Sequence, residues 1–179
     1  MPNIKDVRYV KFRVSDLRKQ QQFLHDFGLH THIDKGLLVA RGTDTSPYIY
    51  LAEEGPTPAF VSVGFLADSE AQLREIAAMD GVAVTENPLE GGGLIAQLTD
   101  PNGFTVDVVA NIAAAAPLAV ADRSGFNQGD VKQRLGERVA FSHTDCFIKR
   151  LGHVVLMVND FATTLEWYQR RFGLLVSDE

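Results

Sequence analysis

The side chain in this sequence with the clearest chemical potential is an imidazole near the start of an apolar run. His153 stands near the beginning of residues 151–158, whose other members are almost all apolar. A neutral imidazole nitrogen is a good ligand for Fe²⁺ or Zn²⁺. A lone histidine on an apolar strand is nevertheless more often packed or hydrogen-bonded than bound to a metal. A metal role for His153 therefore depends on where this run lies in the fold.

The remaining histidines and the cysteine form weaker combinations. His25 falls on the polar side of a predicted helix, and we interpret it as a solvated residue. His30 and His32 share one face of a predicted strand, but without a third ligand they are typical of a surface. His143 and Cys146 lie three positions apart in a predicted linker, where a metal cluster is the less favoured alternative.

The composition is that of a globular protein, and it argues against several functions. The chain has 179 residues, enough for one ordinary domain and part of another, with 45% hydrophobic and 22% charged residues. A net charge of -6 without a basic stripe argues against a nucleic-acid partner. The apolar runs are short and interrupted by charges, so we expect no membrane span. A single cysteine and an N-terminus without an apolar signal-peptide core predict a cytoplasmic protein.

The first part of the sequence predicts a strand, a helix and three further strands. Residues 7–14 alternate in hydrophobicity, as a strand with one buried face does. A polar residue can cap a helix over residues 17–27, whose predicted apolar face includes Phe23 and Phe27. Three short extended runs separated by turn residues follow, at residues 30–34, 37–41 and 48–52.

A second copy of this pattern follows a proline-rich break. Residues 60–66 predict a strand, and Asp68 or Ser69 can cap the helix after it. The run Asp100-Pro101-Asn102-Gly103 predicts a tight turn, because proline presets φ and glycine tolerates positive φ. The glycines at residues 91–93 lack the Lys-Ser or Lys-Thr of a phosphate-binding loop, so we interpret them as a hairpin turn. The other strands are predicted at residues 82–85, 93–98 and 104–109.

The periodic pattern stops after the second unit and restarts near the end of the sequence. We interpret residues 112–147 as a linker. Residues 151–158 predict a strand, and Asn159-Asp160 can cap the helix that follows it. The apolar face of this helix is predicted to consist of Phe161, Leu165, Tyr168 and Phe172. Residues 148–179 therefore repeat the beginning of the first unit and predict the first half of a third.

Several local motifs recur with these units. A strand-end Asp caps the next helix, Phe-Gly-Leu ends the helix at residues 27–29 and again at 172–174, and Asp-Pro-Asn-Gly precedes the last strand of the second unit. In this order the motifs resemble the vicinal oxygen chelate superfamily, which includes glyoxalase I, bleomycin resistance proteins and type I extradiol dioxygenases. The stretch Arg150-Leu151-Gly152-His153 after a linker is most similar to the extradiol dioxygenases, where it opens the catalytic second domain.

The resemblance implies a fold and a division into domains. The fold is α+β, with tandem βαβββ units paired into a cup-shaped mixed sheet and an incomplete third unit. Residues 1–111 would form an N-terminal paired domain, residues 112–147 a linker, and residues 148–179 the start of the second, catalytic βαβββ domain.

The resemblance also locates the positions at which metal ligands lie in this superfamily, on the first and last strands of each unit. In the first two units these positions fall on Tyr9, Tyr50, Val61 and Asp107. Three of these four residues are poor ligands for Fe²⁺, Zn²⁺ or Ni²⁺, and one carboxylate alone does not make a site. We therefore expect the N-terminal domain to contain no metal, as in the two-domain extradiol enzymes.

His153 falls where extradiol dioxygenases have their first iron-binding histidine. In that family a second histidine and a glutamate complete a facial triad that leaves positions open for a catechol and O₂. Both of these ligands are expected beyond Glu179. The sequence is thus expected to be the N-terminal part of an extradiol dioxygenase whose complete form uses Fe(II), and to be inactive alone.

Two other functions remain open at this stage. The first alternative is a metal-free small-molecule binding protein of the bleomycin-resistance kind, which sequesters a ligand between protomers. The second is a structural domain that supports a partner subunit. A reading frame that continues with a histidine and a glutamate at strand positions would favour the dioxygenase.

Two expectations concern charge and assembly. Asp107 is expected to face the cup and to pair with Lys11 or Arg13, because a buried charge needs a partner. The equally weighted alternative is that these charges lie near the open rim and are solvated.

An unpaired strand and helix need a partner, so residues 148–179 are expected to pack on a neighbouring chain of a homo-oligomer or to be poorly ordered.

Overall fold

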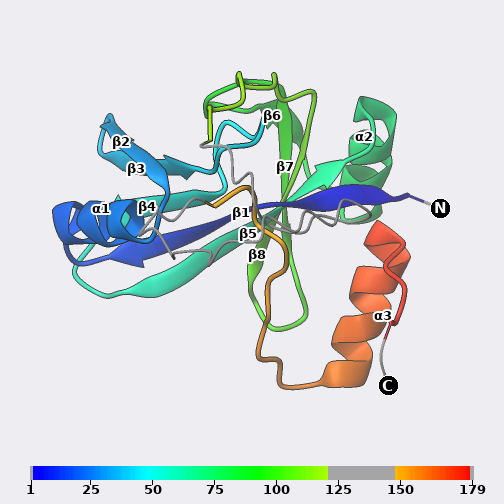
Figure 1. The fold of residues 1–179 in the computed structure, drawn as a ribbon. Helices are drawn as coiled ribbons and strands as arrows, with labels where there is room; N and C mark the ends of the chain where they lie inside the picture. Colours follow the sequence, from blue (N-terminus) through cyan, green and yellow to red (C-terminus); the bar gives the residue numbers. More distant parts are fainter. Residues whose placement is uncertain (1, 121–147, 178–179) are drawn as a thin grey trace, which may run out of the picture.

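The fold is a mixed sheet with helices on its outer side (Figure 1). The computed structural model describes residues 2–120 and 148–177. The possible metal cluster at His143 and Cys146 and most of the predicted linker lie outside these residues. None of the described helices has the length and apolar character needed to cross a membrane.

The first unit has the predicted order of elements. Asp16 caps the helix by accepting hydrogen bonds from the backbone N–H groups of Arg18 and Lys19, both at 3.0 Å. Its elements are β1 (Ile4–Val14), α1 (Leu17–Asp26), β2 (His30–Asp34), β3 (Leu37–Arg41) and β4 (Tyr50–Glu54).

The second unit repeats this order and is closed by the predicted turn. Ser69 caps its helix, and one carboxylate oxygen of Asp100 accepts from the backbone N–H groups of Asn102 and Phe104 in the turn. Its elements are β5 (Ala59–Ala67), α2 (Glu70–Met79), β6 (Val84–Glu86), β7 (Leu94–Thr99) and β8 (Thr105–Ala110).

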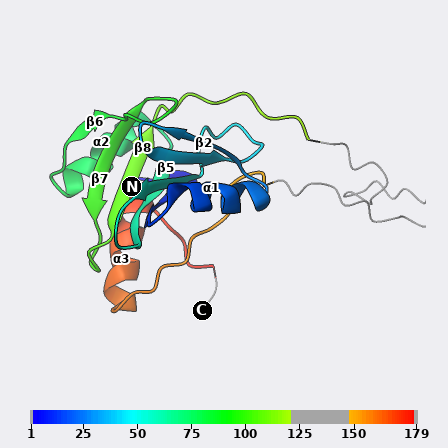
Figure 2. The same ribbon diagram turned by 90° about the vertical axis from the view of Figure 1, so that its left-hand side faces the viewer.

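The two units form one eight-stranded sheet in the order β2-β3-β4-β1-β5-β8-β7-β6. β1 and β5 pair antiparallel at its centre, whereas β1 with β4 and β5 with β8 pair in parallel. On the outer face α1 packs on the half formed by the first unit and α2 on the other half (Figures 1 and 2). The predicted α+β class and tandem units are thus confirmed.

Helix α3 (Phe161–Phe172) packs on the outer face of the chain's own sheet. Tyr168 and Phe172 are buried against Phe65 of β5, with the Phe65 and Phe172 ring centroids 5.3 Å apart. Arg171 donates to both carboxylate oxygens of Asp80 at the end of α2, with Nε 2.6 Å from Oδ2. The expectation that this region needs a neighbouring chain or is poorly ordered was therefore wrong for α3, because the outer face of β5 supplies its partner.

Residues 151–158 are extended but do not form the predicted strand. Their burial alternates as a strand's would, because Val154 and Leu156 pack on the core while Val155 and Met157 are 81% and 91% exposed. They pair with no strand in the described part of the chain. The strand prediction was wrong here because the period of two was present without a neighbouring strand to complete a ladder.

Three aromatic residues predicted to face the core are exposed instead. Phe23 and Phe27 stack on each other on the surface of α1, with ring centroids 5.9 Å apart. Only Leu17 and Leu24 of α1 are buried. Phe161 at the start of α3 is 70% exposed, and Thr164 is buried in that turn instead. The sequence pattern placed the apolar faces too widely around both helices.

We expect the substitution Phe172→Ala to lower the free energy of unfolding by about 3–5 kcal/mol, because it leaves a cavity among Phe65, Trp167 and Tyr168. Phe161→Ala in the same helix is the matched control and should change it by no more than about 0.5 kcal/mol. Urea unfolding of the two variants measures both values. Similar values for both variants would contradict the packing of α3 on the sheet.

Candidate functional site

The concave face of the sheet contains a buried carboxylate that is held by three side chains. Asp107 of β8 is only 3% exposed. Its Oδ2 accepts hydrogen bonds from the Tyr9 hydroxyl at 2.7 Å and from the Ser62 hydroxyl at 2.6 Å. Its Oδ1 accepts from the Gln97 side-chain amide at 2.9 Å. This group of four residues joins four strands and both units.

The sheet register places these four side chains together. Tyr9 of β1 and Asp107 of β8 both lie opposite Gly64 of β5. A side chain at residue 64 would overlap the Tyr9 ring, so the glycine makes the room in which Tyr9 reaches Asp107. Gln97 lies directly opposite Asp107 in the β7–β8 hairpin. The network is therefore a consequence of strand pairing rather than of loop conformation.

Asp107 does not pair with Lys11 or Arg13, so that hypothesis was wrong. Both cations bind Glu53 of β4 instead, with Lys11 Nζ 2.9 Å and Arg13 Nη2 2.7 Å from its carboxylate oxygens. Their hydrogen bonds and charges lower the pKa of Glu53. The alternative of a solvated rim was also wrong for Asp107, which is buried. Three uncharged donors replace the cation that a buried carboxylate was expected to need.

Of the four superfamily metal positions, the structure brings together only Tyr9 and Asp107. Tyr50 stacks on Phe12 at 5.5 Å and joins the cluster under α1. Val61 lies at a register shift in the β1–β5 pair, whereas its neighbour Ser62 shares a face of β5 with Gly64 and reaches Asp107. Sequence alternation could not locate that shift.

The electrostatics of the network keep its tyrosine protonated. Burial and the neighbouring Asp107 carboxylate raise the pKa of the Tyr9 hydroxyl far above its ordinary value. The hydroxyl is therefore a hydrogen-bond donor at neutral pH. Both oxygens of Asp107 accept from protein donors, and within residues 2–120 and 148–177 no other acidic or imidazole side chain joins them. In the described structure Asp107 is thus a buried carboxylate satisfied by three uncharged donors, and the absence of a metal from this domain remains a prediction.

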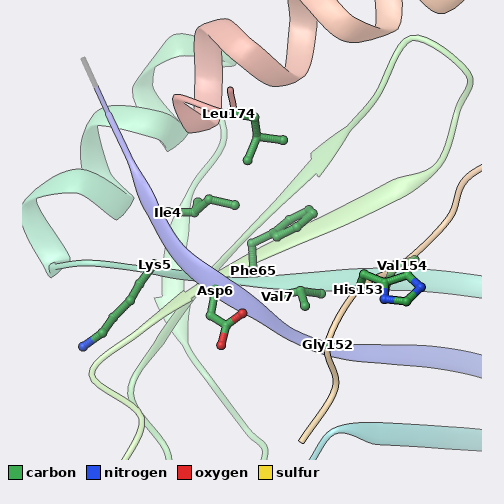
Figure 3. A pocket seen from close by; sticks show the side chains of 9 residues that line it. All are labelled: Ile4, Lys5, Asp6, Val7, Phe65, Gly152, His153, Val154 and Leu174. Atoms are coloured by element: carbon green, nitrogen blue, oxygen red, sulfur yellow. The ribbon is translucent and has the colours of Figure 1, made fainter. Parts of the chain in front are cut away.

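His153 lies away from this network, on the other side of the sheet. It lines a cavity of about 290 Å³ between the first half of β1, Phe65 and Leu174. Figure 3 shows the side chains of Lys5 and Asp6 pointing away from the imidazole ring, and Asp6 is bound by Arg150 at 3.2 Å. In residues 2–120 and 148–177, no group of three or more His, Cys, Asp or Glu side chains is placed to hold a metal ion. The role of His153 as a ligand remains a prediction.

The other described histidines lie at the surface. His25 is exposed on α1, as predicted, with Nδ1 3.6 Å from the Asp26 carboxylate. His30 and His32 are exposed on β2. His32 contacts Glu90, which lies between β6 and β7, a partner that the sequence did not suggest.

The fold matches solved structures whose chains are longer. A manganese-bound glyoxalase from Novosphingobium aromaticivorans superposes with a TM-score of 0.61 at 19% identity, over 70% of this chain and 45% of that one. Homoprotocatechuate 2,3-dioxygenase from Brevibacterium fuscum superposes with a TM-score of 0.59 at 21% identity, over 65% of this chain and 40% of that one. The chain has the vicinal oxygen chelate fold. The resemblance drawn from the sequence motifs is thereby confirmed.

A sequence match extends this likeness beyond the fold. The 3-methylcatechol 2,3-dioxygenase of Pseudomonas putida is 26% identical over 199 residues, which cover 98% of this chain and 58% of the relative. This chain thus spans less than two thirds of that relative's length. No protein-family profile matches the chain. At this coverage the similarity to extradiol dioxygenases includes the segment that carries His153.

We expect Tyr9→Phe to lower the free energy of unfolding by about 2 kcal/mol, because it removes a hydrogen bond to a buried carboxylate. Tyr50→Phe is the matched control. Its hydroxyl accepts only from the neutral Gln20 amide at 3.1 Å, so a loss of about 1 kcal/mol or less is expected. Urea unfolding at neutral pH compares the two variants. Equal losses would contradict the special role of the Asp107 network.

Stability should fall as the pH rises above about 10, where tyrosines of the unfolded chain ionise. Burial raises the pKa of Tyr9, Tyr48 and Tyr168, so the folded state keeps protons that the unfolded state releases. Urea unfolding at increasing pH measures this decline, and Tyr9→Phe should make it shallower. A folded protein that showed full tyrosinate absorbance just above pH 10 without losing stability would contradict it.

Proposed function

We propose that this chain is the N-terminal part of a type I extradiol ring-cleavage dioxygenase that acts on a catechol and O₂. The observation that carries the proposal is the sequence match to 3-methylcatechol 2,3-dioxygenase over 98% of the chain. The fold shared with homoprotocatechuate 2,3-dioxygenase is consistent with it. Because the chain covers 58% of the matched relative, the activity belongs to a longer protein than these residues.

We assign residues 1–111 to a metal-free domain, residues 112–147 to a linker and residues 148–179 to the start of a catalytic domain. The saturated Asp107 network supports a first domain without a metal. The extended, unpaired residues 151–158 support the start of another sheet, because their outer side chains, such as Met157, are exposed and their alternation is that of a strand. Further strands would complete the ladder that they lack here.

His153 would be the first metal ligand of that catalytic domain. Its side chain is exposed on the extended segment and is therefore accessible to other ligands. The described residues do not fit a complete Fe(II) site, because His153 is a single candidate without companions. We therefore assign no catalytic step to these residues. Their contribution to the longer protein would be to present one imidazole next to a rigid sheet.

Two finer features belong to the same proposal. A cytoplasmic protein is supported by the single cysteine, which cannot form an internal disulfide. A homo-oligomer is supported by the exposed Phe23–Phe27 pair on α1, because exposed aromatic clusters are typical of interfaces. The net charge of -6 argues against nucleic acid as a partner.

A ring-cleavage assay of the protein encoded by the uninterrupted reading frame that contains this chain tests the proposal. Loaded anaerobically with Fe²⁺, the protein should convert a catechol to its yellow ring-fission product and consume one O₂ per catechol. His153→Ala should lower this activity by more than about 100-fold, because loss of a ligand costs more than loss of a supporting residue. His25→Ala, which removes an exposed histidine of α1, should leave the activity unchanged.

Absence of ring cleavage across a catechol panel, with stoichiometric iron bound, would contradict the proposal. So would full activity of His153→Ala. If the reading frame ended at Glu179 and its protein product showed no ring cleavage, the metal-free binding protein of the bleomycin-resistance kind would be favoured instead.

A further inference from the structure

An apolar cluster fills the concave face beside the Asp107 network. Tyr9 and Tyr48 meet edge to face in it, with ring centroids 5.2 Å apart. Leu89 lies in the loop of residues 87–93 between β6 and β7, and packs on this cluster from outside the sheet. Leu89 thus packs on a cluster whose two aromatic rings come from the first unit and to which the second unit adds aliphatic side chains. The other buried members of the cluster are Val39, Leu51, Ile95 and Val109.

The loop of residues 87–93 is fixed to the first unit by side-chain contacts. The amide of Asn87 donates to the Tyr48 hydroxyl at 3.1 Å and to the Gly92 carbonyl at 2.9 Å. Gly91, Gly92 and Gly93 have φ values of 80°, 58° and 87°, which side-chain-bearing residues rarely adopt. A side chain at residue 91 or 93 would also overlap residues 110–113, on which the loop packs closely.

A contact between His32 and Glu90 closes the loop over the concave face. His32 lies on β2 and Glu90 in the loop after β6, and these two strands are the opposite edges of the sheet. Nε2 of His32 is 2.5 Å from Oε1 of Glu90, although the residues are 58 positions apart. Both side chains are about half exposed, so the contact is weak enough to break reversibly. It has the geometry of a latch.

The guanidinium of Arg8 lies beside the same cluster, and one of its N–H groups donates no hydrogen bond to a described residue. A register shift between Val7 and Tyr9 leaves Arg8 next to Tyr48, and Nη1 of Arg8 donates to the Ser46 hydroxyl at 2.9 Å. Nε of Arg8 is buried and has no hydrogen-bond partner among the described residues. Burial lowers the pKa of the guanidinium.

No described carboxylate neutralises Arg8 directly. Asp6 and Asp44 lie near enough to raise its pKa against the effect of burial, but neither forms an ion pair with it. Asp6 pairs with Arg150 instead. A half-buried guanidinium with a free N–H and no anionic partner favours binding of an anionic group.

We propose that residues 87–93 are a lid latched by His32 and Glu90, and that the cup beneath it binds an aromatic molecule carrying one anionic group. The ring would take the place of Leu89 on Tyr48 and Tyr9, and the anion would meet Arg8. This site goes beyond ring cleavage, because it uses only the first two units and does not involve His153. Its tests are therefore independent of the proposed dioxygenase activity.

Hydrogen exchange of the 179-residue chain tests the latch. Glu90→Gln should accelerate exchange of the lid amides Asn87 and Gly92 by about tenfold, and equally that of Ala113, which lies outside the lid but donates to the Gly91 carbonyl. Amides of β8 should not change. Glu166→Gln removes a more exposed ion pair on α3, far from the lid, and is the control for loss of a surface carboxylate. His32→Gln should reproduce the effect, and the double variant should add nothing further.

The dye anilinonaphthalene sulfonate tests the cup, because it combines an aromatic system with one anion. Its fluorescence should saturate at one site per chain, with at least about fivefold tighter binding to Glu90→Gln than to the parent or to Glu166→Gln, since the open state is then more populated. Adding Arg8→Gln to Glu90→Gln should abolish the gain. Near-UV circular dichroism must show that each variant is folded, because loosened proteins also bind this dye.

Two results would overturn the inference. Unchanged exchange of the lid amides in both Glu90→Gln and His32→Gln would show that the contact is no latch. Dye binding that does not depend on Arg8 in folded variants would show that the cup does not select an anion.

Discussion

A carboxylate in an apolar interior must be satisfied by its surroundings, and in this protein Asp107 organises both units around that requirement. Its partners come from β1, β5 and β7, so the first unit contributes Tyr9 and the second Ser62 and Gln97. Gly64 leaves the space that the Tyr9 ring occupies. The antiparallel β1–β5 pair at the centre of the sheet is therefore held by polar contacts on one face and by apolar packing under α2 and α3 on the other.

This arrangement determines where chemistry can take place. Both carboxylate oxygens of Asp107 already accept hydrogen bonds from protein donors, which supports the proposal that a metal-dependent reaction uses another part of the protein. The segment with His153 is unpaired and exposed, whereas α3 after it is fixed by Phe65 and Asp80. A proposed catalytic domain would thus begin on a rigid support. The concave face contains the apolar cluster beneath the loop that carries Leu89, and this cluster is the proposed binding surface for an aromatic molecule.

Local rules were sufficient for the order of elements but not for the contacts between them. Helix caps such as Asp16 and the turn at Asp100 are set by neighbouring residues and could be predicted. The hairpin register that places Gln97 opposite Asp107 leaves residues 100–104 in the connection, one residue more than the predicted turn. The register shift at Val61, the burial of Tyr168 on β5 and the His32–Glu90 contact depend on residues distant in sequence. Periodicity alone does not specify them.

The most direct test of the Asp107 network is the hydroxyl proton of Tyr9, observed by NMR in protein with ¹³C-labelled tyrosine. A hydroxyl that donates to a buried carboxylate should give a slowly exchanging proton signal coupled to the Tyr9 ring at neutral pH. The signal should persist when Fe²⁺ or Zn²⁺ is added and disappear in a folded Asp107→Ala variant. Absence of this signal in the parent protein, or its loss on stoichiometric metal addition, would contradict a structural and metal-free centre.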